Sequence, residues 1–441
     1  MQLPLANFGR ARAPVAPYAL LPYNCTVQIL ISAGEASGDM YGAQLIEALR
    51  ARVVTGLRPV QAGHNPATTQ PATAQPLTFF GAGGERMRTA GCDIIVDAKD
   101  LAVVGITEIV SHLPGILGLY KKLIRAADER QPDLAVVIDS PAFNWRVARQ
   151  MRKRGIPVVY YVCPQFWAWR QGRVKLLRKY INKALVIFPF EEKFYRDRGV
   201  DATFVGHPLA DLPAPAVARE AYAAHHRLDA TKPWITLMPG SRRKEVRMNL
   251  PTILEAVDRL GPNYEFQLPV ARTLEPAFVD GLIDAWRRTR TPHAAETRQS
   301  TSLPLIRLVP ESLPALYHSR AGIVASGTAT VEAAIMGTPF VMVYRVSPLT
   351  YALGKPRVKV AHFAMVNLIA EKEVVPELVQ SKFTPENIVA ELGKIIPDGE
   401  PRTRMIQGLA AVKAKLKQES NGGHPSEKAA TVILGMLGVG A

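Results

Sequence analysis

Short apolar runs alternate with segments of helical periodicity from residue 26 onward. The runs are five to seven residues long and rich in β-branched side chains, which is typical of strands buried in a parallel sheet. In the first half they lie at 28–32, 77–82, 134–140, 158–164, 184–190 and 202–208. In the second half they lie at 234–240, 264–270, 306–310, 321–326 and 340–346. This repeated alternation predicts an α/β protein with two parallel sheets.

A proline-rich stretch that begins at Pro208 separates the two sets of runs and predicts a domain boundary. We therefore expect one Rossmann-like domain over 26–207 and a second over 208–365, followed by a loop and C-terminal helices over 366–441. Open parallel sheets carry their ligands outside the carboxyl ends of the strands. The cleft between the two sheets is therefore where we expect the chemistry.

Two further segments lack the periodicity of a packed element. Residues 1–25 contain several prolines and no clean apolar core before a cleavage site, so they are predicted to be a loose extension and not a signal peptide. Residues 58–77 are rich in Pro, Ala, Thr and Gln, which predicts an inserted surface loop.

The stretch "ISAGEASGDMYGAQLIEAL" predicts a strand, a turn and a helix at the point where the first sheet opens. Its turn brings Glu35, Ser37, Gly38 and Asp39 to the carboxyl edge of that sheet. The glycines are spaced by four, unlike the G-x-G-x-x-G fingerprint, which argues against a nicotinamide or flavin site. In the simpler alternative the glycines only relieve the turn and Asp39 caps the helix, but this leaves Glu35 unexplained.

In the second half, "GIVASGTATVEAAIMG" predicts another strand, turn and helix. The turn residues Ser326, Gly327 and Thr328 offer backbone N–H groups and hydroxyls at a helix N-terminus, which is a ready anion site. Glu332 follows about one turn later, where a carboxylate can accept hydrogen bonds from two ribose hydroxyls. Phosphate and ribose together suggest a nucleotide, although an ordinary capped helix would present the same residues.

Two other strand ends carry charged side chains. Arg242 follows the run "WITLMPGS" and could fork two hydrogen bonds to a diphosphate, although a charge run at a strand exit is usually a solvated face. Asp139 follows "PDLAVVI", and partial desolvation at a cleft would raise its pKa toward that of a general base. A turn-forming aspartate is the simpler alternative.

Composition narrows the class of protein. The 441 residues are 48% hydrophobic, which supports well-formed cores, and the formal net charge of +16 favours polyanions, anionic lipids or phosphorylated substrates. Cys25, Cys92 and Cys163 are scattered, which argues against a disulfide framework and suits a reducing compartment. There is no D-x-D motif and no cluster at metal-ligand spacing, so we expect no bound metal ion.

One predicted helix has the pattern of a membrane-surface helix. Lys121, Lys122 and Arg125 border its apolar stripe, which suits a bilayer interface, although a core-facing helix shows a similar stripe. The stripe consists of Ile106, Ile109, Val110, Leu113, Leu117, Tyr120 and Ile124. Residues 140–190 carry eleven Lys or Arg and no acid, which leaves nucleic-acid binding open on charge alone.

Ten motifs in order resemble the lipid A disaccharide synthase family over about residues 26–380. They are "AGEASGDMYGA", "GAGGERM", "LAVVGITEIV", "VIDSPAFN", "YYVCPQFWAWRQGRV", "FPFEEKFY", "FVGHPLAD", "LMPGSRRKEV", "ASGTATVEAAIMGTPFVMVYR" and "NLIAEKEVVPELVQ". The resemblance implies a GT-B glycosyltransferase, inverting and without a metal cofactor. Its substrates would be UDP-2,3-diacylglucosamine and 2,3-diacylglucosamine 1-phosphate, and its products lipid A disaccharide 1-phosphate and UDP.

The resemblance also implies roles for individual residues. Asp139 matches the base, Arg242 the diphosphate-side arginine, and Glu332 the ribose partner. Asn367 matches the asparagine of a nucleotide loop, and Glu35 to Asp39 would line the acceptor side, with Glu35 as a second catalytic candidate beside Asp139.

Because both substrates carry acyl chains, the resemblance implies a peripheral enzyme on the cytosolic face of the inner membrane. It favours the membrane over nucleic acid as partner of the basic surface. It also suggests a homodimer that exchanges C-terminal segments, or C-terminal helices that pack on the N-terminal domain. An epimerase or another lipid glycosyltransferase of GT-B architecture remains the alternative, and less so an RNA- or anionic-surface-binding protein.

Overall fold

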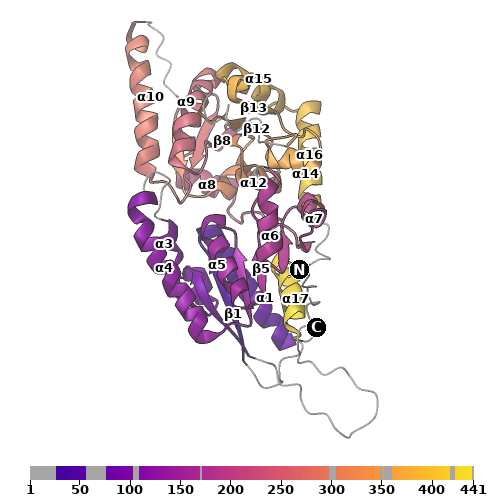
Figure 1. Cartoon of the computed structure of the whole chain (residues 1–441). Helices are drawn as coiled ribbons and strands as arrows, with labels where there is room; N and C mark the ends of the chain where they lie inside the picture. Colours follow the sequence, from indigo (N-terminus) through magenta and orange to yellow (C-terminus); the bar gives the residue numbers. More distant parts are fainter. Residues whose placement is uncertain are drawn as a thin grey trace, which may run out of the picture. The chain divides into compact units, whose positions relative to one another are not determined.

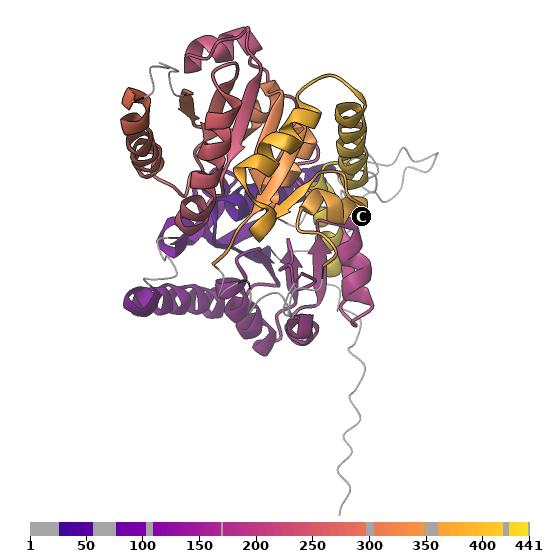
Figure 2. The same ribbon diagram turned by 90° about the horizontal axis from the view of Figure 1, so that it is seen from above.

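A computed structural model of the chain describes residues 26–55, 76–102, 109–168, 171–296, 304–347, 351, 360–417 and 423–439. The predicted extension 1–25 and all but the last residues of the predicted loop 58–77 lie outside the described part. Figures 1 and 2 give two views of the chain.

The first sheet has seven strands in the order β3-β2-β1-β4-β5-β6-β7. These are β1 (Val27–Ala33), β2 (Leu77–Gly83), β3 (Cys92–Asp97), β4 (Leu134–Ile138), β5 (Val158–Tyr161), β6 (Lys183–Val186) and β7 (Ala202–Phe204). The helices that accompany them are α1 (Ala36–Thr55), α2 (Glu85–Thr89), α3 (Ala98–Ala102), α4 (Ile109–Arg130), α5 (Pro141–Lys153), α6 (Val174–Tyr180) and α7 (Pro189–Arg196), with the short η1 (Gln171–Arg173).

The second sheet has six strands in the order β10-β9-β8-β11-β12-β13. These are β8 (Trp234–Met238), β9 (Glu265–Pro269), β10 (Ile306–Val309), β11 (Ala321–Ala325), β12 (Phe340–Tyr344) and β13 (Glu377–Val379). Its helices are α8 (Arg219–His226), α9 (Arg243–Leu260), α10 (Pro276–Glu296), α11 (Ser312–His318), α12 (Thr328–Met336), α14 (Met365–Ala370), α15 (Pro385–Ile395) and α16 (Glu400–Lys417), with η3 (Gln380–Lys382); α17 (Pro425–Leu437) ends the chain.

The recorded ladders are parallel, as the apolar runs predict. β1 pairs with β2 and β4, and β8 pairs with β9 and β11. Every residue of β4 is fully buried, because helices cover both faces of a parallel sheet. α1 packs with α2 and α4 packs with α5, while α9 packs with α10 and α15, and α12 with α11, α14 and α16.

The chain divides into two compact units. The first comprises Met1–Tyr161, Tyr180–Asn182 and Ser426–Ala441, and the second comprises Val162–Lys179 and Lys183–Pro425. The domain boundaries predicted from the sequence stay predictions.

Candidate active site

The carboxyl edge of the first sheet brings two predicted loops together. The parallel register places Ala33 of β1 opposite Ile138 of β4, so the residues that follow each strand are neighbours. A Cβ atom built on Gly34 would lie 2.4 Å from the Ser140 Oγ atom, which explains why a glycine occupies this position. Glu35 and Ser37 are exposed beside this contact.

The turn that follows β4 is held in an unusual backbone conformation. Asp139 and Ser140 have φ values of 47° and 44°, and Val162, which follows β5, has a φ of 58°. Left-handed backbone is uncommon outside glycine, above all at a β-branched residue, and costs on the order of 1–3 kcal/mol at each position. Strain of this kind gathers at functional sites, which supports the assignment of Asp139 as a reacting group.

Asp39 differs from its predicted role as a substrate contact. Its side chain is buried, and its oxygens accept hydrogen bonds from the backbone N–H groups of Gly84 (2.6 Å), Arg86 (3.2 Å) and Met87 (3.1 Å). Asp39 therefore caps the start of α2 and not, as in the simpler sequence alternative, the helix that follows its own turn, because it lies within the first turn of that helix, α1. Gly38 is also buried, since an added Cβ atom would lie 3.2 Å from the Ala33 Cβ atom.

In the second sheet, Arg242 stands at the exit of β8 as predicted. It is the N-cap residue of α9, its side chain is 77% exposed, and its Nη1 atom donates to Glu245 Oε1 at 3.1 Å. The carboxylate of Glu245 also accepts the Ser241 N–H. An exposed ion pair of this kind contributes little to stability, so the guanidinium can turn to a ligand at small cost.

The predicted anion turn is only partly available. The backbone N–H of Ser326 donates to the Val343 carbonyl (3.0 Å), and its hydroxyl donates to the Phe363 carbonyl (2.8 Å). Gly327, with a φ of 137°, and Thr328 then open α12, and the first N–H groups of a helix have no partner within it. Gly327 and Thr328 are therefore the part of the turn that can still serve as the predicted anion site, while the Ser326 side chain bonds a neighbouring loop.

Glu332 lies about one turn into α12, at the helix position that the sequence predicts, and its role toward a ribose stays a prediction. Its Oε2 atom accepts a hydrogen bond from the Ser312 hydroxyl at 2.7 Å. Burial raises the pKa of its carboxyl group, and the Ser312 hydrogen bond partly offsets this.

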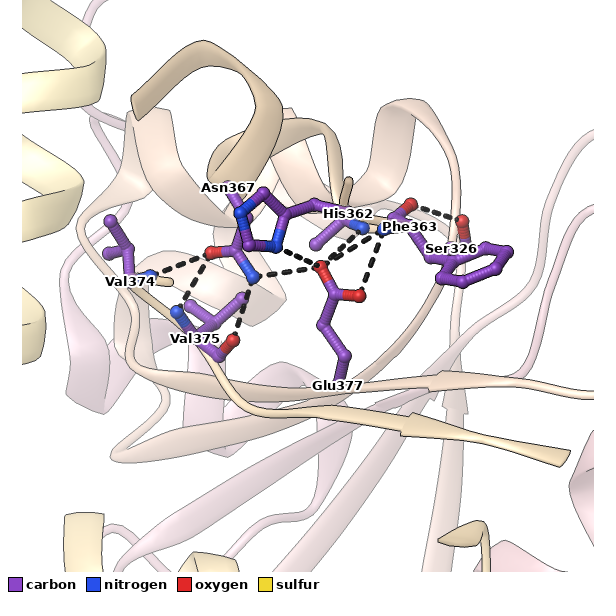
Figure 3. A network of polar contacts seen from close by, with 8 residues as sticks. Ser326, His362, Phe363, Asn367, Val374, Val375 and Glu377 are labelled. Carbon is purple, nitrogen blue, oxygen red and sulfur yellow. Dashed lines mark hydrogen bonds and ion pairs between the residues drawn. The ribbon is translucent and has the colours of Figure 1, made fainter. Parts of the chain in front are cut away.

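Asn367 is fully buried, and its amide is saturated by protein groups (Figure 3). Its Oδ1 atom accepts the N–H groups of Val374 and Val375, and its Nδ2 atom donates to the Val375 carbonyl and to Glu377 Oε1. No group of the side chain is left for a nucleotide, so its predicted direct contact is corrected to a structural one.

Glu377 is the centre of this network and was not singled out in the sequence (Figure 3). Its carboxylate accepts the N–H groups of Phe363 and Ala364 and lies 3.7 Å from the His362 Nδ1 atom. The Phe363 carbonyl in turn accepts the Ser326 hydroxyl. Glu377 and Asn367 thus tie the segment 362–367 to the anion turn.

The predicted membrane stripe lies on α4 and can be followed only in part. Ile106 is outside the described residues, as are the side chains of Ile109, Val110 and Leu113. Leu117 is 45% exposed, and Lys121 and Lys122 are exposed as well.

The buried face of α4 is formed by other residues, namely Leu123, Ala126 and Ala127. An open hollow of about 280 Å³ beside it is lined by Tyr120, Lys121, Ile124, Arg125, Asp128 and Gln150. Leu117 is therefore not on the face of α4 that packs on the sheet, whereas Tyr120 of the same stripe is half-buried and its ring lies against that of Phe143.

Two features are absent from the described residues. No helix in the described ranges is both long and apolar enough to cross a membrane. The same ranges contain no group of three or more His, Cys, Asp or Glu side chains that could hold a metal ion.

Comparisons with known proteins agree with this geometry. The family model described as lipid-A-disaccharide synthetase matches residues 29–430. The lipid-A-disaccharide synthase of Koribacter versatilis is 48% identical over 408 residues, which are 92% of this chain and 98% of the relative. That of Acidobacterium capsulatum is 48% identical over 391 residues, or 88% of this chain and 91% of the relative.

A solved structure, that of the glycotransferase of kitacinnamycin, aligns with a TM-score of 0.54 at 14% identity, covering 94% of this chain and 99% of that chain. This likeness concerns the fold alone, and with the two parallel sheets it gives a GT-B architecture. Two sequence relatives and a family model that spans most of the chain identify the activity. The chain belongs to the lipid-A-disaccharide synthase family and is a hexosyltransferase that forms the disaccharide of lipid A.

Proposed function

We propose that the chain transfers the sugar of UDP-2,3-diacylglucosamine to the 6-hydroxyl group of 2,3-diacylglucosamine 1-phosphate. The products are lipid A disaccharide 1-phosphate and UDP. The observation that carries the proposal is the strained Asp139–Ser140 turn, which presents a carboxylate at the carboxyl edge of a parallel sheet.

Asp139 acts as the general base in this scheme. Its carboxylate takes the proton of the acceptor hydroxyl as that oxygen forms a bond to the anomeric carbon of the donor. The bond from the anomeric carbon to the UDP oxygen breaks in the same step, so the configuration inverts and the electron pair leaves with UDP. Glu35 and Ser37, which are exposed beside the turn, are the further candidates for acceptor contacts.

The departing UDP gains negative charge, and three groups of the second unit can bind it. Arg242 supplies a guanidinium that is free to turn, and Gly327 with Thr328 supplies a helix N-terminus. Glu332 supplies a carboxylate for the ribose hydroxyls. We propose that these groups suffice without a metal ion, while Asp39, Asn367 and the Ser326 hydroxyl hold the loops in place.

The membrane association is part of the proposal. Acylated substrates reside in a bilayer, and Leu117, Lys121 and Lys122 form an exposed apolar and cationic surface on α4. We propose that this surface docks on anionic lipids at the cytosolic face of the inner membrane. The homodimer predicted from the family stays a prediction, which sedimentation of the purified chain tests.

The test measures UDP release in detergent micelles, with donor alone and with donor plus acceptor, for the native chain and Asp139→Asn. The control is Asp133→Asn, because Asp133 lies at the other end of the same strand and accepts the Gln28 N–H at 2.8 Å. We expect acceptor-dependent release that falls at least 100-fold in Asp139→Asn alone, while UDP binding persists. Release that ignores the acceptor would indicate a hydrolase or an epimerase-like reaction and would refute the proposal.

A further inference from the structure

We propose that Asn144 and Tyr160 are positioning residues that hold the Asp139–Ser140 turn in the conformation from which Asp139 acts. The proposal rests on the proposed function, because it assigns the base to Asp139. It predicts that both residues affect the chemical step and leave substrate binding unchanged.

Asn144 lies in the first turn of α5 and is fully buried. Its Nδ2 atom donates to the carbonyl oxygens of Ile138 (2.7 Å), Asp139 (2.9 Å) and Ser32 (3.0 Å), and its Oδ1 atom accepts the Ser32 hydroxyl (2.6 Å). One amide thus joins the end of β1, the end of β4 and the strained turn. A structural amide could serve any loop, but this one reaches the carbonyl of the reacting residue itself.

Tyr160 fixes the same carbonyl from β5. Its hydroxyl donates to the Asp139 carbonyl at 2.8 Å, and the Asp139 N–H donates to the Tyr161 carbonyl at 3.1 Å. On the far side of the turn, the Ser140 carbonyl accepts the N–H groups of Phe143 and Asn144. The peptide groups on both sides of Asp139 are therefore held by neighbouring elements.

Two consecutive left-handed residues persist only when the surroundings fix them. The side-chain direction follows the backbone dihedral angles, so relaxation of this turn to ordinary φ values would move the Asp139 carboxylate. Displacement of a catalytic group by about 1 Å can lower a rate by roughly 100-fold without changing what binds. The hydrogen bonds to the Asp139 carbonyl therefore act on catalysis through the orientation of the base.

β5 offers a matched pair of variants for the test. Tyr160 and Tyr161 are consecutive and both fully buried, but the Tyr161 hydroxyl has no hydrogen-bond partner among the residues that the structure describes. Tyr160→Phe removes the bond to Asp139, while Tyr161→Phe removes a hydroxyl that bonds to none of the described residues. We expect kcat to fall about tenfold in Tyr160→Phe, with KM and the Kd for UDP within about twofold of the native values, and no loss of kcat in Tyr161→Phe.

Asn144→Ala provides the second pair, with Asn182→Ala as its control. Asn182 accepts the Val158 N–H at 3.0 Å at the opposite end of β5, so its loss disturbs the same sheet away from the turn. We expect a fall in kcat of about 100-fold in Asn144→Ala, and little change in Asn182→Ala. Amide hydrogen exchange of residues 139–144 should accelerate in Tyr160→Phe and in Asn144→Ala. This measurement reports how firmly the turn is held, independently of activity.

Native kcat in Tyr160→Phe, or an equal loss in Tyr161→Phe, would overturn the positioning role while the synthase reaction stands. A rise in KM with kcat unchanged would overturn it too, because it would indicate a substrate contact. Absence of acceptor-dependent UDP release in the native chain would instead refute the proposed function, and with it the role of Asp139 on which the inference rests.

Discussion

Glu332 is the residue at which nucleotide recognition can be tested most directly. Glu332 lies in the first turns of α12, next to the proposed phosphate site, and its carboxylate accepts a hydrogen bond from the hydroxyl of Ser312. A carboxylate can accept hydrogen bonds from both ribose hydroxyls, whereas an amide offers one acceptor oxygen. The 2′-hydroxyl of the ligand is therefore a partner whose removal should matter only while Glu332 is present.

We expect Glu332→Gln to weaken UDP binding about tenfold and to abolish most of the preference for UDP over 2′-deoxy-UDP. Isothermal titration of both nucleotides measures this. Glu391→Gln, on α15, should bind both as the native chain does. An unchanged preference for the ribonucleotide in Glu332→Gln would assign the ribose to another group.

Glu191 makes stability depend on pH. It is fully buried, and burial raises its pKa from 4.5 to about 7, partly offset by hydrogen bonds from the Trp167 indole and the N–H groups of Ile187 and Phe188. The folded state then holds the proton more tightly than the unfolded chain does. The contribution of this group to stability is complete below pH 4.5 and is lost as the pH rises through about 7.

The free energy of unfolding of the native chain, relative to that of Glu191→Gln, should therefore fall by up to about 3 kcal/mol between pH 4 and pH 8. Denaturant unfolding at several pH values measures the difference. Glu192→Gln, next in the chain, should follow the native pH dependence. If the difference in free energy of unfolding between the native chain and Glu191→Gln did not change with pH, Glu191 would have its ordinary pKa.

At the scale of elements, the hydrophobic pattern predicted the interior strands and the edge strands β7 and β10, and it missed β3 and β13 at the two remaining edges. Neither forms a clear apolar run, because Asp93 and Asp97 interrupt the apolar residues of β3 and β13 has only three residues, one of them Glu377. Asp139 could be placed because it directly follows the buried strand β4, and Arg242 because it lies only four residues after Met238, the end of β8.

The supporting side chains could not be found in this way. Asn144 contacts Ser32, which is 112 residues away in sequence, and Glu377 contacts Phe363 and Asn367 across a loop. Which polar groups meet after folding depends on how helices cross the sheet, and periodicity does not report this. The same limit led Asp39 to be assigned to substrate, since its partners on α2 come 45 to 48 residues later.

Asp39 caps α2, and a substitution at this position tests whether the residue stabilises the fold or contacts the substrate. Asp39→Asn leaves one acceptor oxygen for three N–H groups, so we expect a loss of about 1–2 kcal/mol of stability and a KM within about twofold of the native value. Glu35→Gln, four residues earlier in the chain and exposed, should show unchanged stability and lower activity. Thermal unfolding and UDP release of both variants decide the matter, and a large rise in KM in Asp39→Asn would return Asp39 to the substrate site.

At the scale of the whole molecule, the net charge of +16 gives long-range attraction to any anionic surface and does not choose among them. The position of the cations on the protein surface can distinguish one anionic partner from another. Lys121 and Lys122 stand beside the exposed Leu117 on α4, whereas Lys372 and Lys382 are equally exposed in the second unit without a predicted apolar stripe. The two pairs carry the same charge, so replacing either changes the net charge by the same amount.

We expect the double variant Lys121→Glu, Lys122→Glu to bind vesicles of anionic lipid at least tenfold more weakly than the native chain, because each cation near such a surface contributes about 1 kcal/mol. Lys372→Glu, Lys382→Glu should lose much less. Cosedimentation with vesicles at low salt and at 0.5 M salt measures the binding of both variants. Raised salt should weaken the binding of the native chain toward the level of the first variant. Equal losses in the two variants would mean that overall charge alone drives the attraction, and α4 would then have no special role at the membrane.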